Sequence, residues 1–376
     1  MFFRCIRKQK RRSLSVQSFQ SLSSVQLEHS ESDLTEVDVI DEFQQVANFS
    51  NAVCSARLIE SFNQEKDSLQ DFYDQMAYES LLEFLLTIVT SVFGAFDFAC
   101  RLFSLLWDIF RPVTNLTNLE GKNVLIVGGA GGVGSAVAKR LLKVGAKVAL
   151  WDIDEKRLNS VQAELQDSGY KTTVKVVDIR NGKAVKAAGD ELSQSFEVDI
   201  LFNSAGVCNA GDSINDSDER LQELVDTNYL GVVYVTRYFW KKFIQTGRGH
   251  IVSMASVAGI AGVPHIVEYT GTLHGVVGYM DALEADTFAR NIHGINFTVC
   301  NPPFIHTAMA HDLTTTGVPK YPWVDTEQCA TEILRAISSQ KRIHTFPWEA
   351  NLFCSFKSIL PRKRFNLLNG RFWTYD

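Results

Sequence analysis

Residues 123–134 read Asn-Val-Leu-Ile-Val-Gly-Gly-Ala-Gly-Gly-Val-Gly, and a helical pattern follows them from Ser135 to Val144. An apolar β-rich run, a glycine turn and a helix in immediate succession are how a βαβ unit begins. Gly128, Gly132 and Gly134 have the spacing that permits a tight turn, close approach of a pyrophosphate and close packing of the helix. Backbone N–H groups at the start of the helix then face the phosphates. The stretch therefore predicts a dinucleotide-binding turn.

The next predicted strand, residues 147–151, leads into Asp152. In this arrangement a carboxylate at that position meets the ribose hydroxyls in the adenosine half of a dinucleotide. It favours NAD over NADP, because it would repel a 2′-phosphate. Lys156 and Arg157 lie nearby in the sequence and temper that preference, so NADP stays open as a second cofactor.

Strand and helix patterns alternate through the rest of residues 119–340. Alternating units of this kind give a parallel sheet with helices on both of its faces. The sequence thus predicts the α/β class, with a Rossmann-type doubly wound parallel sheet. The further strands are expected at 173–177, 199–202, 250–254 and 294–300, and the helices at 181–195, at 218–242 and after Tyr269.

Over about residues 119–336 the chain resembles the short-chain dehydrogenase/reductase family. The matching landmarks stand in chain order: the glycine turn, Asp178, Asn203-Ser-Ala-Gly206, Asn228, Ser256, Tyr269 and the segment from Pro302 to Thr307. The phrases at 150–153 and 254–259, with the tail at 356–372, are similar to the membrane- and lipid-droplet-associated hydroxysteroid and retinol dehydrogenase branch. Enzymes of that branch act on lipophilic alcohols and ketones.

The resemblance implies an oxidoreductase in which Ser256, Tyr269 and Asn228 serve hydride transfer. The tyrosine, with an ordinary pKa of about 10, has to pass a proton at neutral pH, so the site must stabilise its phenolate. The serine hydroxyl would position and polarise the substrate oxygen, while the dinucleotide carries the hydride. The residues implied in cofactor binding are Gly128, Gly132, Gly134, Asp152, Asp178, Asn203, Ala205, Gly206, Tyr269, Pro302 and Thr307.

One departure from the family pattern bears on catalysis, because Leu273 stands where the family has its active-site lysine. One helical turn separates this position from Tyr269, and a leucine supplies neither charge nor hydrogen bond. His274 points about 100° away around the helix and is a poor substitute. Val127, where threonine is usual, and Pro303, where glycine is usual, are smaller departures.

Two hypotheses about function follow from this departure. The first is an NAD(P)-dependent enzyme that interconverts a lipophilic alcohol, such as a retinoid, steroid or long-chain alcohol, and its carbonyl compound, attenuated at position 273. The second is a dinucleotide-binding pseudoenzyme that serves as a scaffold or regulator on a membrane or lipid droplet. The landmarks favour the enzyme, since acid–base assistance contributes only ~100- to 10,000-fold to a rate.

The chain before the glycine turn has a different character. Six basic residues lie within the first twelve, and Ser/Gln-rich and then acidic sequence extends to Glu42. A signal peptide would need an apolar run after its basic region, and none is present, so residues 1–78 are predicted to be a disordered extension.

Residues 79–112 are dominated by Leu, Phe, Ile, Val and Trp, and their polar residues recur at steps of three or four. A helix gathers those polar residues into one narrow stripe, and Pro112 ends the helix. The charges interrupt the ~20 apolar residues that spanning requires, so a helix or hairpin in the plane of a membrane fits better than a span. The alternative is a helix buried against the domain or a partner. The stripe comprises Glu83, Thr87, Thr90, Gly94, Asp97, Arg101, Ser104, Asp108 and Arg111.

The end of the chain, residues 341–376, is basic and aromatic. It is expected either to touch anionic lipid headgroups or to form a charged surface helix. Its basic residues are Lys357, Arg362, Lys363, Arg364 and Arg371, and they alternate with Phe356, Phe365, Phe372 and Trp373.

Composition limits the partners. The formal charge of −6 points away from nucleic acid, and the seven cysteines are scattered without metal-ligand spacing, which favours reduced thiols and no metal site. We therefore expect a lipophilic small-molecule substrate and a membrane surface as partners, and a homodimer is compatible with this organisation. The expected location is the endoplasmic reticulum membrane or a lipid droplet, with the catalytic domain facing the cytosol.

Overall fold

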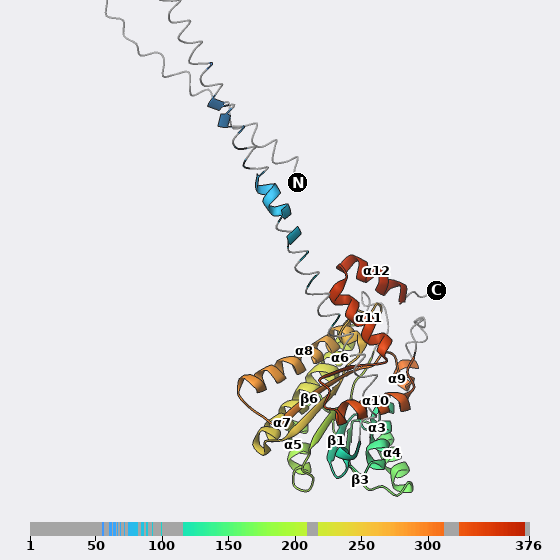
Figure 1. Ribbon diagram of the computed structural model, residues 1–376. Helices are drawn as coiled ribbons and strands as arrows, with labels where there is room; N and C mark the ends of the chain where they lie inside the picture. Colours follow the sequence, from blue (N-terminus) through green and yellow to red (C-terminus); the bar gives the residue numbers. More distant parts are fainter. Residues whose placement is uncertain are drawn as a thin grey trace, which may run out of the picture. The chain divides into compact units, whose positions relative to one another are not determined.

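The computed structural model describes residues 116–208, 217–311 and 323–372, together with scattered positions between 55 and 99 (Figure 1). The scattered positions are helical and solvent-exposed, so helix is present before residue 79, where the sequence predicted a disordered extension. Most of that extension and of the predicted amphipathic segment at 79–112 lies outside the described residues. Within the described part of the chain, no helix is long and apolar enough to cross a membrane.

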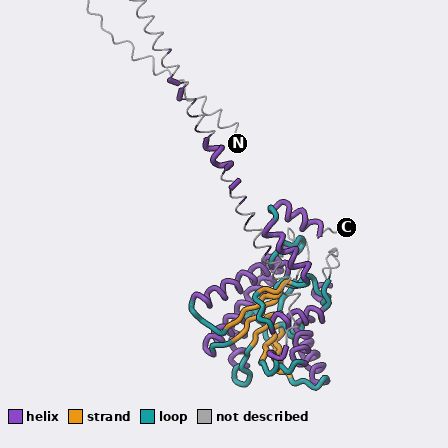
Figure 2. The backbone as a smooth tube through the Cα atoms, viewed as in Figure 1, coloured by secondary structure: helices purple, strands orange, loops and turns teal. Residues whose placement is uncertain are grey.

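Seven parallel strands form one sheet in the order β3-β2-β1-β4-β5-β6-β7 (Figure 2). Their bounds are β1 Asn123–Val127, β2 Lys147–Asp152, β3 Thr172–Val176, β4 Ile200–Asn203, β5 Gly249–Met254, β6 Ile295–Asn301 and β7 Ile343–Thr345. β1 pairs with β2 on one side and with β4 on the other, so the direction of winding reverses at β1. This confirms the Rossmann-type doubly wound sheet.

Helices cover both faces of the sheet (Figure 1). The first face carries α3 (Gly132–Lys143), α4 (Glu155–Asp167) and α10 (Thr326–Ser338), and the second carries α5 (Gly182–Leu192), α7 (Val232–Thr246) and α8 (Val267–Ala289). Alternate residues of β1 supply the two cores: Val124 and Ile126 pack into the first, and Leu125 and Val127 into the second. A strand buried on both faces reads as a continuous apolar run, as this one does.

The predicted helix at 218–242 is interrupted in the structure. It consists of α6 (Asp218–Leu224), a π-helical turn η3 (Val225–Gly231) and then α7. A π-helical turn inserts one residue into the helical repeat and is often found at functional sites. Here the turn contains Asn228.

The chain after residue 340 is part of the folded domain. β7 adds the last strand to the sheet, and α11 (Trp348–Ile359) and α12 (Arg362–Phe372) follow it. These helices pack on η4 (Val257–Gly259), the short turn after β5. Phe365, which the sequence placed among exposed aromatic residues, is buried because it packs with Phe353 and Val257. The remaining short elements are η2 (Leu116–Leu119) and α9 (Ala308–His311).

His250 makes the stability of this fold dependent on pH. Its imidazole lies in β5, 5% exposed, with Nε2 2.8 Å from Thr298 Oγ1. Burial lowers the pKa of His250 from 6.5 to about 4. Below pH 6.5 the unfolded chain binds a proton at this residue more readily than the folded chain does. The free energy of unfolding therefore keeps the full contribution of the neutral His250 above pH 6.5 and loses it as the pH falls toward 4.

We expect His250 to cost the protein about 2 kcal/mol of unfolding free energy between pH 7 and pH 4.5, a loss that His250→Gln should not show. Urea unfolding of both proteins at the two pH values measures it. An equal loss in the two proteins would show that His250 does not carry this dependence.

Candidate active site

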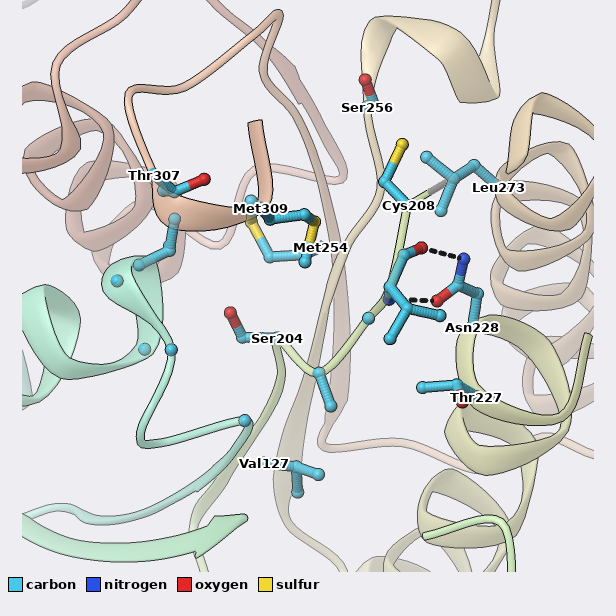
Figure 3. Close-up of a pocket in the computed structure, with 18 of the residues that line it drawn as sticks. Val127, Ser204, Cys208, Thr227, Asn228, Met254, Ser256, Leu273, Thr307 and Met309 are labelled. Carbon is cyan, nitrogen blue, oxygen red and sulfur yellow. Dashed lines mark hydrogen bonds between the residues drawn. The ribbon is translucent and has the colours of Figure 1, made fainter. Parts of the chain in front are cut away.

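A cavity of about 500 Å³ lies at the carboxyl ends of the strands (Figure 3). It is lined by the residues that follow β1, β2, β4, β5 and β6 and by the first turns of α8. The crevice where winding reverses, between β1 and β4, is where doubly wound sheets bind their ligands. The cavity is therefore the candidate site.

The glycine turn between β1 and α3 forms one wall of the cavity. Gly128 has a φ of +83°, and a Cβ there would stand 2.6 Å from the backbone N of Ala205, so only glycine fits. A Cβ on Gly134 would collide with the carbonyl oxygen of Gly128. Gly132 faces the methyl group of Thr307, at 3.2 Å from where its Cβ would be.

α3 begins at Gly132 with no side-chain cap. Its first N–H groups are thus left for a ligand, and the helix dipole favours an anion at this end. The turn suits a pyrophosphate, because the three glycines let its backbone pack tightly and bring its N–H groups close to a bound phosphate.

Asp152, the last residue of β2, is tied to the glycine turn. Its Oδ2 accepts a hydrogen bond from Ala130 N at 2.9 Å, and its Oδ1 accepts one from Asp154 N at 3.0 Å. Arg157 also lines the cavity, and its guanidinium pairs with Asp154 at 3.2 Å. The carboxylate of Asp152 is therefore held beside the glycine turn, at the end of the cavity formed by β2 and β3, and Arg157 is already paired.

Asp178 follows β3 and lines the same end of the cavity with Arg180. The two side chains form a bidentate ion pair, with Arg180 Nε 2.9 Å from Oδ1 and Nη2 2.8 Å from Oδ2. These hydrogen bonds hold the pKa of Asp178 below its ordinary value. The sequence identified Asp178 but missed Arg180, although an arginine two residues after an aspartate can fold back on it.

The loop after β4 lies between the two halves of the cavity. Ala205 and Gly206 line it, whereas Asn203 does not. The Asn203 side chain is buried inside the sheet layer, where Nδ2 donates to Thr236 Oγ1 at 3.0 Å and to Ser253 Oγ at 3.3 Å. Its position suits a residue that supports the loop rather than one that touches a ligand.

The side chain of Asn228 holds Val207, the residue after Gly206 in the loop that follows β4 (Figure 3). Its Oδ1 accepts from Val207 N at 2.8 Å, its Nδ2 donates to Val207 O at 2.8 Å, and the same Nδ2 is 3.3 Å from Thr272 Oγ1. The amide thus joins the π-helical turn, the loop after β4 and α8. In this geometry Asn228 is a positioning residue at the cavity wall.

Ser256 and Tyr269 line the half of the cavity opposite the end formed by β2 and β3. Ser256 Oγ donates to the carbonyl of Pro302 at 3.1 Å and accepts from Ala258 N at 3.2 Å. Tyr269, in the first turn of α8, packs among apolar side chains, and burial raises the pKa of its phenol above its ordinary value. Pro302 and Thr307 complete this wall.

Leu273 lies one turn after Tyr269 and also lines the cavity, 6% exposed. It packs with Ala258, Val263 and Cys208 (Figure 3). His274 does not line the cavity, since its Nδ1 lies 2.9 Å from the carbonyl oxygen of Thr270 in its own helix. Among the described residues, the cations that line the cavity are Arg157 and Arg180, and both pair with carboxylates at the end formed by β2 and β3. Cys208, which the sequence did not single out, has its pKa raised to about 12 by burial.

A short chain dehydrogenase family model matches residues 122–317, and the chain belongs to this family. Human 17-beta-hydroxysteroid dehydrogenase 13 is 24% identical over 290 residues, which is 77% of this chain and 93% of that protein. Mouse epidermal retinol dehydrogenase 2 is 26% identical over 248 residues, 65% of this chain and 80% of that protein. The family expected from the sequence is thereby confirmed, and the chain is similar to a hydroxysteroid dehydrogenase and a retinol dehydrogenase, as the resemblance implied.

Solved structures show the same fold. A short chain dehydrogenase/reductase from Burkholderia phymatum in complex with NAD superposes with a TM-score of 0.59 at 24% identity, covering 69% of this chain and 99% of that one. A gluconate 5-dehydrogenase from Burkholderia cenocepacia J2315 in complex with NADP and tartrate gives 0.56 at 21% identity, covering 63% and 98%.

Proposed function

We propose that this chain is an oxidoreductase that interconverts a lipophilic alcohol and its carbonyl compound at a membrane surface, using NAD in preference to NADP. The observation that carries the proposal is that the glycine turn, Asp152, Ser256 and Tyr269 line a single cavity. The similarity to a hydroxysteroid dehydrogenase and a retinol dehydrogenase supports this class of substrate.

The cavity fits a nicotinamide dinucleotide. The glycine turn and the uncapped start of α3 would hold the pyrophosphate, and Asp152 would accept hydrogen bonds from ribose hydroxyls. The Asp178–Arg180 pair would border the adenine. When bound, the dinucleotide gives a hydride to the substrate carbon or takes one from it.

The side chains of this protein would handle the proton at the substrate oxygen. Ser256 Oγ, now turned to Pro302, can rotate to hold that oxygen beside Tyr269. The Tyr269 phenol is protonated at neutral pH and would give its proton to a carbonyl oxygen during reduction, but burial raises its pKa and so makes it a weaker acid. Oxidation needs the phenolate as the base, so its rate should rise with pH.

The substrate end of the cavity is apolar. Val263, Ile266 and Leu273 form part of its wall, and Met254, Phe304 and Met309 extend it. Apolar walls with few polar groups bind lipophilic molecules by excluding water. This supports a substrate that is mostly hydrocarbon apart from the reacting oxygen.

The helical positions before the domain support a membrane location. Leu81, Phe84, Leu85, Ile88 and Val92 are all exposed, and their spacing of three or four places them on one face of a helix. Such a face is typical of a helix that lies in the headgroup region of a bilayer. We propose that residues 79–112 hold the protein on the endoplasmic reticulum or a lipid droplet, with the domain in the cytosol.

A second candidate function is favoured by Leu273. With no cation from the described residues beside Tyr269, the cavity could bind a dinucleotide without turning over a substrate. The protein would then be a membrane-bound pseudoenzyme that serves as a scaffold or regulator.

The Asp152→Ala variant tests the cofactor preference. We expect the wild-type protein to bind NADH more tightly than NADPH, and the variant to lose that preference, because the carboxylate no longer repels a 2′-phosphate. Fluorescence titration of both dinucleotides into both proteins measures it. An unchanged ratio of the two dissociation constants would mean that Asp152 does not face the ribose.

Deletion of residues 81–111 tests the membrane location. Without the apolar face the protein should move from the membrane pellet to the supernatant when cells are fractionated, while still binding NADH. A deleted protein that stays entirely in the pellet would rule out this segment as the anchor.

Formation of NAD(P)H from NAD(P)+ with retinoid, steroid and long-chain alcohols, and its consumption with the corresponding carbonyl compounds, separates the two functions, with Tyr269→Phe as the inactive control. For an attenuated enzyme, Leu273→Lys should lower the pKa of Tyr269, shift the pH profile of oxidation downward and raise the rate at neutral pH by roughly 100-fold.

A pseudoenzyme should gain nothing from the lysine, because the rest of the pocket would not hold it. A wild-type protein that already converts substrate at ~1 to 1,000 per second, in a reaction that depends on Tyr269, would contradict both the attenuated enzyme and the pseudoenzyme. Another group would then supply the charge, and His274 would be the first to replace.

A further inference from the structure

The last two helices differ from the rest of the molecule in charge. Residues 350–372 contain five basic residues and no Asp or Glu, in a protein whose formal charge is −6. The exposed basic side chains among them include Lys363 and Arg364, near the start of α12. A local excess of this size attracts anions whatever the net charge of the whole chain.

The inner face of α12 is bound to the wall of the candidate active site. Phe365, 5% exposed, packs with Val257 and Ala261. One turn further, the Asn369 side chain donates from Nδ2 to the carbonyl oxygen of Gly262 at 2.7 Å. The segment 257–266 that receives these contacts lines the cavity from its other side and leads into Tyr269. α12 therefore supports the cavity wall from outside.

The outer face of α12 has a pattern of its own. Lys363, Leu367 and Arg371 follow one another at steps of four, so their positions form one stripe opposite Phe365 and Asn369. Leu367 is 71% exposed, one of the most exposed large apolar side chains among the described residues. A leucine thus stands in the middle of a cationic stripe.

We propose that this outer face of α12 docks on an anionic lipid surface, and that docking steadies the cavity wall that α12 supports. Lys363 and Arg364 would meet the headgroups, and Leu367 would enter the layer below them. An exposed leucine between cations favours a lipid surface over an acidic protein, since a polyanionic protein surface offers no apolar layer. Lys357 is not part of this surface, because it donates to the carbonyl oxygen of Ile260.

This inference rests on the proposed function only for the source of the substrate. If the substrate is lipophilic, the lipid surface that supplies it also steadies the wall of the pocket that receives it. Such coupling requires the lipid surface to bind the protein more tightly when α12 is packed on segment 257–266 than when it is not. The binding itself does not depend on turnover, so it can fail or succeed separately from the proposed enzyme.

The test uses the full chain and vesicles of pure phosphatidylcholine or of phosphatidylcholine with phosphatidylserine. Segment 81–111 contains three acidic and two basic residues, so it should bind both kinds of vesicle without preferring the anionic one. Lys363→Gln with Arg364→Gln should weaken binding to the anionic vesicles by roughly 25-fold and leave binding to the neutral ones unchanged. The matched control, Lys183→Gln with Lys241→Gln, removes two exposed cations from α5 and α7 and should change binding less than twofold.

Equal weakening by the two pairs of substitutions would overturn the proposal, since any two cations would then serve. It would also be overturned if soluble glycerophosphoserine or poly-glutamate displaced the protein from vesicles at millimolar concentration, because the partner would then be an anion without an apolar layer. Leu367→Ser should weaken binding to anionic vesicles as well, and an unchanged affinity would exclude insertion of the leucine.

Hydrogen exchange tests the effect on the wall. Anionic vesicles should slow exchange in residues 257–266 of the wild-type protein. Asn369→Leu keeps a side chain of similar size but loses the hydrogen bond to Gly262, so it should bind the vesicles as before and lose most of the slowing. Faster exchange on binding, or equal slowing in the variant, would overturn the coupling. If the slowing is found but no substrate is turned over, the docking surface stands and the proposed enzyme fails.

Discussion

The structure depends on the close approach between the glycine turn and its neighbours at the centre of the sheet. β1 pairs with β2 on one side and with β4 on the other, and the chain crosses over in opposite directions to reach these two strands. In the crevice between β1 and β4, the backbone at Gly128 lies directly against the backbone at Ala205. A single Cβ at Gly128 would push the loop after β4 away, and one at Gly134 would push α3 off the strand. The position of α3, the shape of the cavity and the place of Asp152 all follow from this constraint.

The central part of the fold could be predicted because its signals are local. An apolar run, a glycine turn and a helix pattern follow one another within 123–144, and a carboxylate at the end of the next strand needs no tertiary information. The short strand β7 was missed because three residues carry too little periodicity. For the end of the chain a surface helix was one of two expectations, but the packing of α11 and α12 on the domain was not foreseen, because it depends on partners far away in the sequence.

The sequence predicted many of the residues at the site, but it did not predict the hydrogen bonds that each of them makes. Asn203 was expected at the ligand, but its side chain is buried and donates to Thr236 of α7 and Ser253 of β5, and such tertiary partners cannot be read from a motif. Asn228 was expected among the reacting groups, but its bonds to Val207 depend on a π-helical turn, which no spacing in the sequence announces. Arg180 was missed because its role is set by a partner, Asp178, and not by a motif.

The C-terminal helices have a consequence for the order in which the molecule is built. A chain emerges during synthesis from its N-terminal end, so Ser256 and Tyr269 are made well before Phe353, Phe365 and Asn369, which close the outside of the wall between them. Until β7 is made, β6 is an edge strand with unpaired backbone groups. The first part of the domain can thus form its glycine turn and half of its cavity early, while the apolar wall stays open to water and to chaperones. The glycine turn and the helices that complete the cavity wall are thus made at different times, although they meet around one cavity in the folded protein.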